Sequence, residues 1–228
     1  MSSLRYFYTC WNGDEMVHDY QIIYEKLYRY YGPQGWWPAK TAFEMMIGAI
    51  LVQNTSWRNV EKALSNLKPF LSPAKIEKLS FDELAELIRP SGFFKMKAQR
   101  IKAFMEWLKA YEYDLSQIKM KDCNELRDEL LAVKGIGSET ADVILLYAFD
   151  QPVFVADAYA RRIFFRLGIN LPKSYDSFRL EVERALPRDL AMFNEFHALL
   201  VEHAKEHCKK APICDGCPLA SICDRRLG

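Results

Sequence analysis

The chain has 228 residues, of which 50% are apolar, and its 31 lysines and arginines almost balance its 30 aspartates and glutamates. This length and apolar content allow a substantial core, in one large domain or two small ones. The near-neutral charge excludes a strongly basic tail of the kind typical of nucleic-acid binding, so any DNA-binding surface has to arise from local clustering of charge.

The start of the sequence has no basic region followed by an apolar signal segment. No stretch approaches the roughly 18 apolar residues that a membrane span requires. We therefore expect a soluble, cytoplasmic protein that has no membrane partner.

Helical spacing of apolar residues runs through most of the chain, and capping residues mark several helix starts. We find no sustained strand alternation, repeat or low-complexity segment, and we assign no structure to the aromatic residues 1–19. The fold class is therefore predicted to be all-α. The predicted helices cover residues 20–31, 41–51, 56–67, 80–88, 95–111, 122–133, 138–150, 157–167 and 188–207.

A Gly- and Pro-rich loop carrying Trp36 and Trp37 follows the first predicted helix. Two indole rings are difficult to bury together in such irregular backbone. Either they fasten the loop to the body of the protein, or they present flat faces to a ligand.

Gly135 and Gly137 flank a single residue between two predicted helices. Glycine permits the backbone conformations that a tight turn needs. Ser138 is a suitable N-cap for the second helix, and the outward-facing amides at such a turn attract phosphate. Taken alone, the motif fits an ordinary corner between two helices better than a phosphate site.

Four of the six cysteines fall within one short C-terminal segment, with the spacing C-x5-C-x2-C-x5-C. Without an export signal, this clustering favours a metal site over disulfides. Structural zinc usually uses two Cys-x-x-Cys pairs, whereas here one such pair lies between longer gaps, which favours an iron–sulfur cluster and leaves zinc as the alternative. Cys10 and Cys123 are expected to be packed thiols. The predicted metal ligands are Cys208, Cys214, Cys217 and Cys223.

The hairpin residues 133–137, the later Asp157 and the cysteine segment together resemble the helix-hairpin-helix (HhH-GPD) DNA glycosylase superfamily, to which endonuclease III belongs. The resemblance implies a two-domain helix-hairpin-helix glycosylase fold with a C-terminal [4Fe-4S] cluster loop. One implied domain joins residues 1–38 to 151–228 and carries the cluster. The other is a helical barrel of residues 39–150, with the hairpin at 123–149. Pro218 follows the third cysteine as in endonuclease III, although the first cysteine gap is one residue shorter.

The resemblance also implies the partner, which is double-stranded DNA containing a damaged base, bound by a monomer associated with the nucleoid. Gln53 matches a glutamine that the family inserts into the duplex. Three basic residues near the cluster, Lys205, Lys209 and Lys210, fit a solvated helix end or phosphate contacts. The implied DNA-binding residues are Gln53, Lys134, Gly135, Ile136, Gly137 and Ser138.

Asp157 precedes a predicted helix, where an aspartate ordinarily serves as an N-cap. A capping carboxylate stays ionised beside the positive end of the helix dipole. Such a charge can stabilise the cationic sugar that develops when an N-glycosidic bond breaks. The resemblance places Asp157 at the catalytic aspartate of the superfamily.

Glu139 stands where bifunctional members of the family carry a lysine. A carboxylate cannot form a Schiff base, so we expect hydrolysis that leaves an abasic site, without lyase activity. A favourable charge in the first helical turn is the simpler role for this residue.

The tryptophan loop, the glutamine loop, residues 89–93 and the hairpin resemble the 3-methyladenine glycosylase branch, although its members lack the cluster. That branch sandwiches a base between aromatic rings, and a cationic methylated purine gains from stacking on indole. The predicted function is therefore a monofunctional DNA glycosylase for alkylated purines. The alternatives are an endonuclease III-like glycosylase for oxidised pyrimidines or mismatched bases, and a non-catalytic DNA-binding module. The implied pocket residues are Trp36, Trp37, Trp57 and Lys205, although Lys205 fits a surface role equally well.

Overall fold

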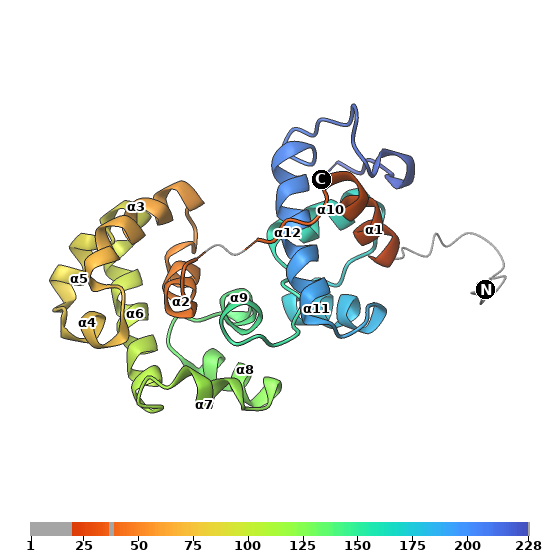
Figure 1. The fold of residues 1–228 in the computed structure, drawn as a ribbon. Coiled ribbons are helices and arrows are strands. Elements are labelled where there is room, and N and C mark those ends of the chain that lie inside the picture. Colours follow the sequence, from red (N-terminus) through yellow and green to blue (C-terminus); the bar gives the residue numbers. More distant parts are fainter. Residues whose placement is uncertain (1–19, 37–38, 228) are drawn as a thin grey trace.

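The computed structural model describes residues 20–36 and 39–227, which fold into helices without any strand (Figure 1). This confirms the all-α prediction. No helix among these residues is long and apolar enough to cross a membrane. The α-helices are α1 (Tyr20–Tyr31), α2 (Ala42–Leu51), α3 (Trp57–Leu67), α4 (Pro73–Lys78), α5 (Phe81–Leu87), α6 (Phe94–Lys109), α7 (Leu115–Lys119), α8 (Cys123–Ala132), α9 (Ser138–Ala148), α10 (Ala158–Arg166), α11 (Tyr175–Ala185) and α12 (Leu190–Glu206), with 3-10 turns η1 (Lys68–Phe70), η2 (Arg89–Ser91) and η3 (Ala220–Ile222).

Three helices were missed by the sequence analysis, namely α4, α7 and α11. The first two have only six and five residues, too few for an apolar period to be read. Helix α11 is amphipathic and buries Phe178 and Val182 one turn apart, a signal that the sequence analysis did not use.

Side-chain caps fix most of the predicted helix starts. Thr41 accepts a hydrogen bond from the backbone of Glu44, and Ser80 forms a complete capping box with Glu83. The prediction of Ser138 as an N-cap was wrong, because Gly137 occupies that position and Ser138 is already helical. The hydroxyl of Ser138 instead donates to Asp176 at 3.3 Å.

The helices form two groups joined through α9 (Figure 1). Helices α2 to α6 pack on one another, and α9 lies against α2. Helices α1, α10 and α12 form the other group, where α9 also contacts α11 and α12. The first described residue, Tyr20, donates to Glu181 at 2.7 Å, so chain segments far apart in sequence share this group. The domain boundaries named above stay a prediction.

Lys97 on α6 joins two loops of the first group. Its side chain is 1% exposed, and its ammonium group donates to the carbonyl of Leu51 at 2.8 Å and to that of Ser91 at 2.6 Å. Burial, followed by the charge of Arg100, lowers the pKa of Lys97 to about 8. Lys97 thus fixes the end of α2, which leads into the Gln53 loop, against the turn that leads into Phe93.

Candidate active site

The turn between α8 and α9 depends on close approach by Arg100. Gly135 has a φ of +89°, and a Cβ atom at this position would overlap the aliphatic stem of Arg100. The amide of Ile136 donates to Val133 at 3.0 Å and its side chain is buried, so this residue stabilises the turn from within. The first amides of α9 have no acceptor within the helix and form the end that a phosphate would approach, with exposed Lys134 beside it.

Gln53 lies against this hairpin. Its amide group donates to the carbonyl of Gly135 at 3.1 Å and to the hydroxyl of Thr140 at 2.9 Å. Arg100 donates to the amide oxygen of Gln53. The side chain predicted to enter the duplex is therefore held, in the DNA-free protein, at the same turn that is predicted to bind the backbone.

Asp157 is the N-cap of α10, as its sequence position predicts. One carboxylate oxygen accepts the amide of Ala160 at 2.7 Å. The other lies 3.6 Å from Nε2 of His197 on α12. Asp157 is 9% exposed, so its charge depends on these groups and on the helix N-terminus rather than on bulk water.

Trp36 reaches the same position from the loop after α1. Its ring packs edge-on against His197, with centroids 5.4 Å apart, and against Tyr147, with centroids 5.5 Å apart. The hydroxyl of Tyr147 is 2.6 Å from Nδ1 of His197. His197 therefore lies next to both the predicted catalytic aspartate and one of the predicted pocket tryptophans.

Glu139, in the first turn of α9, faces this cluster although it remains exposed at the surface. The protein around the carboxyl group and then the negative charge of Asp157 raise the pKa of Glu139, while His197 opposes the shift. Two carboxyl groups and one histidine consequently share the same electrostatic environment.

The other predicted pocket residues lie in different surroundings. Trp57, the first residue of α3, packs on Gly48 and lines a groove of ≈ 440 Å³ with Lys40 and Glu61. Lys205 is exposed on the last turn of α12, where it lies 4.0 Å from Glu202. Trp37 lies outside the described residues. The base-sandwich arrangement of these residues stays a prediction.

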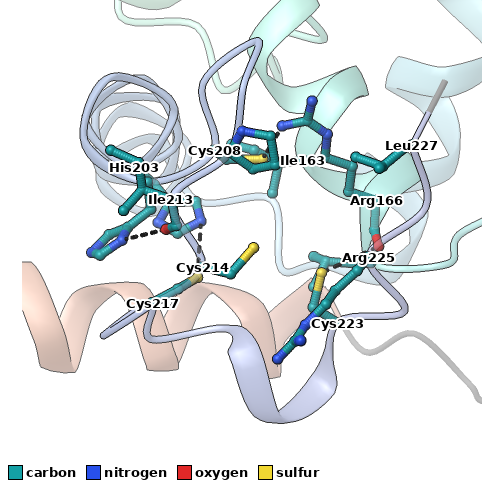
Figure 2. Close-up of a pocket in the computed structure, with 13 residues that line it drawn as sticks. Ile163, Arg166, His203, Cys208, Ile213, Cys214, Cys217, Cys223, Arg225 and Leu227 are labelled. Carbon is teal, nitrogen blue, oxygen red and sulfur yellow. Dashed lines mark hydrogen bonds between the residues drawn. The ribbon is translucent and has the colours of Figure 1, made fainter.

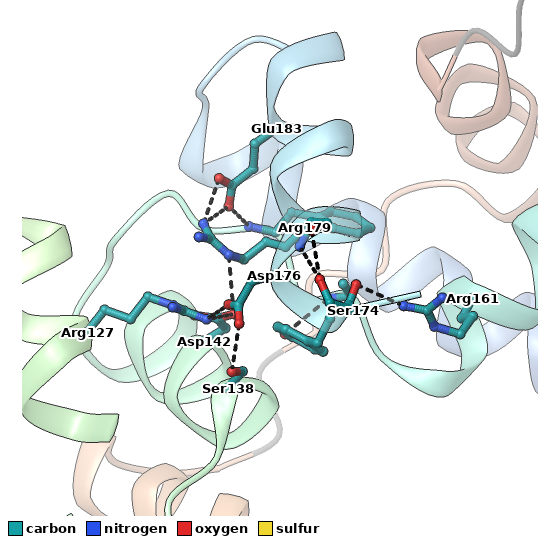
Figure 3. A network of polar contacts seen from close by, with 12 residues as sticks. Arg127, Ser138, Asp142, Arg161, Ser174, Asp176, Arg179 and Glu183 are labelled. Atoms are coloured by element: carbon teal, nitrogen blue, oxygen red, sulfur yellow. Dashed lines mark hydrogen bonds and ion pairs between the residues drawn. The ribbon is translucent and has the colours of Figure 1, made fainter. Parts of the chain in front are cut away.

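A buried ion-pair network joins the hairpin helices to α11 (Figure 3). Arg127 on α8 donates to fully buried Asp142 on α9 at 2.7 Å and also contacts Asp176. Arg179 lies 3.7 Å from Asp142 and pairs with Glu183 at 2.7 Å. Burial raises the pKa of Asp142, and the two arginines oppose that shift. The network therefore holds the hairpin rigidly against the helix group that carries Asp157.

The four C-terminal cysteines line one pocket beside α10 and α12 (Figure 2). Arg166 donates to the sulfur of Cys208 at 3.4 Å, and the thiol of Cys223 donates to the Arg166 carbonyl at 3.2 Å. The sulfur of Cys217 lies 3.9 Å from Nε2 of His203. Helix α10, which begins at Asp157, thus ends at the cysteine segment.

The donor set of this pocket consists of four thiols, which suits either a zinc ion or an iron–sulfur cluster. Within the described part of the chain, however, no three His, Cys, Asp or Glu side chains are close enough to hold one metal ion. A single zinc would need every sulfur at about 2.3 Å. The structure therefore brings four thiols to one pocket without deciding between the two groups.

A family comparison assigns the chain. The model of the HhH-GPD superfamily base excision DNA repair proteins matches residues 47–188. The chain belongs to this superfamily. It is a DNA glycosylase, with the helix-hairpin-helix at residues 123–148 and DNA as its partner.

Relatives of this HhH-GPD protein cover most of its length. It is 46% identical over 217 residues to a Methanocaldococcus jannaschii protein provisionally named a DNA repair glycosylase, covering 93% of this chain and 97% of the relative. It is 32% identical over 190 residues to endonuclease III of Sulfolobus acidocaldarius, covering 81% and 82%. The solved H. pylori 3-methyladenine DNA glycosylase bound to 1,N6-ethenoadenine has a TM-score of 0.70 and 30% identity, covering 81% of this chain and 96% of that one.

Sequence reasoning missed several polar residues of this HhH-GPD site. His197 lies among the buried apolar residues of α12, and a polar residue at such a position was the available signal. Arg100, Asp142 and Tyr147 gave none, because their roles depend on partners from distant helices.

Replacing Gly135 should weaken both the fold and DNA binding. We expect Gly135→Ala to lower the free energy of unfolding by about 1–3 kcal/mol, because a non-glycine residue is strained at this φ and Arg100 has to move. Denaturant titration and the Kd for a duplex with an abasic-site analogue measure the two effects. Gly137→Ala is the matched control for the stability measurement, since its added Cβ meets nothing within 4 Å. Equal losses of stability in the two variants would contradict this account.

Proposed function

We propose that this glycosylase is monofunctional and removes alkylated purines, such as 3-methyladenine, from double-stranded DNA, acting as a monomer in the cytoplasm. The observation that carries the proposal is the meeting of buried Asp157 and the Trp36 ring on His197. The Trp36 ring would offer a flipped base an aromatic surface, and the nearby carboxylate of Asp157 would stabilise positive charge on its sugar. The identity to the H. pylori 3-methyladenine glycosylase supports the choice of substrate.

In this mechanism the duplex is held by its backbone at the α8–α9 turn, and the damaged nucleotide is flipped towards Trp36. A cationic alkylpurine leaves without prior protonation, so no strong general acid is needed. The fixed negative charge of Asp157 stabilises the oxocarbenium-like sugar, and water adds to it. Glu139 supplies no amine, which makes water the nucleophile.

Replacing Asp157 separates catalysis from capping. We expect Asp157→Asn to abolish release of 3-methyladenine from methylated duplex DNA, because asparagine caps a helix as well as aspartate but carries no charge. Base release is measured directly, beside duplexes carrying an oxidised pyrimidine or a mismatched thymine. Asp189→Asn is the matched control, since Asp189 caps α12 in the same way by accepting the amide of Met192 at 2.7 Å.

The outcomes of this assay distinguish the candidate functions. Reaction of only the oxidised pyrimidine or mismatch would favour an endonuclease III-like substrate, a choice that the identity to the Sulfolobus enzyme supports. Full activity of Asp157→Asn would refute the catalytic role of the aspartate. Binding without release of any base would favour the non-catalytic module.

The absence of lyase chemistry is tested at Glu139. We expect the wild-type protein to leave abasic sites that break only after alkali, and to form no covalent DNA complex with borohydride. Glu139→Lys should give a borohydride-trapped complex, because it places an amine beside the abasic sugar. Glu139→Gln serves as the control without an amine. Trapping of the wild-type protein would show that another lysine reaches the sugar and would overturn the monofunctional assignment.

We further propose that Cys208, Cys214, Cys217 and Cys223 hold a [4Fe-4S] cluster. When bound, the group would crosslink a short segment that has little core of its own, a structural rather than a redox role. The thiols would be its ligands, and Arg166 beside Cys208 would offset the thiolate charge.

Protein purified without oxygen should contain iron and acid-labile sulfide in equal amounts and absorb broadly in the visible range. Cys217→Ser should lose the iron, because it removes a predicted ligand. Cys123→Ser should retain it, because Cys123 is a buried thiol at the start of α8, outside the cysteine pocket. Elemental analysis that finds zinc without iron would contradict the cluster.

A further inference from the structure

His197 connects three helices at the proposed active site. It lies on α12, is 5% exposed, and faces Tyr147 of α9 through Nδ1 and Asp157 of α10 through Nε2. Its ring also packs against Trp36. His197 therefore lies against the proposed catalytic carboxylate, a buried phenol and the tryptophan on which the base is proposed to stack. From this position it can influence the reaction.

The partners of the ring assign its proton. The carboxylate oxygen of Asp157 faces Nε2, and a lone pair on that nitrogen would oppose the lone pairs of the oxygen. The hydroxyl of Tyr147 lies 2.6 Å from the other nitrogen and 3.5 Å from the carbonyl of Asn194, so the shorter bond to Nδ1 takes its hydrogen and fixes the ring plane. Nε2 therefore carries the hydrogen and directs it towards Asp157.

The two oxygens of Asp157 have different partners. One is bound by the helix amide of Ala160 at 2.7 Å, whereas the other lies 3.6 Å from Nε2, slightly beyond hydrogen-bond length. Contacts of this kind are often long in a free enzyme and shorten in the substrate complex. The helix cap fixes the first oxygen but does not fix the direction of the second.

We propose that His197 is a positioning residue that donates its Nε2–H to Asp157 and holds the second carboxylate oxygen towards the reacting sugar, with Tyr147 fixing the ring. This rests on the proposed catalytic role of Asp157. A fixed direction of this oxygen matters because the stabilisation of a cationic sugar depends on where the negative charge points. Tyr147 fixes the orientation and the proton position of the His197 ring, and the ring in turn fixes the orientation of the Asp157 carboxylate.

The test compares two replacements of His197. Glutamine carries an amide N–H at the position of Nε2, whereas leucine has similar bulk and no donor. Single-turnover base release at saturating enzyme should fall about 10- to 100-fold in His197→Leu, since a hydrogen bond to a charged group is lost. It should recover substantially in His197→Gln. The Kd for duplex DNA with an abasic-site analogue should stay within about threefold in both, a split that loss of fold would not produce.

The ring proton is tested without a rate measurement. The ¹⁵N chemical shifts of the His197 ring, identified by their loss in His197→Gln, should show hydrogen on Nε2 in the wild-type protein. In Tyr147→Phe the ring should exchange between tautomers, because the bond to Nδ1 is absent.

Each outcome bears on the proposal separately from the proposed function. Wild-type rates in His197→Leu, equal losses in the leucine and glutamine variants, or a bare Nε2 in the ¹⁵N spectrum would each overturn the positioning role. Full activity of Asp157→Asn would instead refute the proposed function on which it rests. If Asp157→Asn is inactive and His197→Leu has normal activity, Asp157 keeps its catalytic role and only the positioning role of His197 is refuted.

Discussion

The buried carboxylate of Asp142 is the constraint on which the rest of the site depends. Asp142 belongs to α9 and is fully buried, and an unpaired charge at this position would strongly destabilise the fold. Arg127 of α8 donates to it at 2.7 Å, and Tyr175 at the start of α11 is near enough to help lower the pKa of this carboxyl group. Satisfying one buried charge therefore fixes how α8, α9 and α11 meet.

The residues around Asp142 also contact the segment before Asp157 and the hairpin turn. The hydroxyl of Tyr175 accepts the amide of Ala156 at 3.2 Å, immediately before Asp157. On the other side Arg127 contacts Asp176, which accepts the hydroxyl of Ser138 at the hairpin. The proposed mechanism needs this rigidity, because backbone contacts at the hairpin would set the place where a flipped sugar meets the carboxylate.

The sequence predicted those features that depend on residues close together in the chain. The caps at Ser80 and Asp157 and the turn at Gly135 are local, and the structure has each of them. The Ser138 cap failed because the helix already includes Ser138, with Gly137 at the cap position, and the hydroxyl of Ser138 donates to the distant Asp176. The histidine contact to Asp157 lies beyond sequence reasoning, since its residues are 40 positions apart and meet only through the packing of α12 on α10.

The carboxyl groups of Glu139 and Asp157 have different surroundings. Glu139 has a raised pKa because the protein around it and the charge of Asp157 both disfavour its ionised form. Asp157 instead receives an amide hydrogen bond and faces a histidine. In the proposed mechanism it is the carboxylate of Asp157, held by the helix cap, that would face the sugar cation. A lysine at position 139 would pair with that charge and offer an amine, whereas glutamate does neither and leaves the carboxylate available to the sugar.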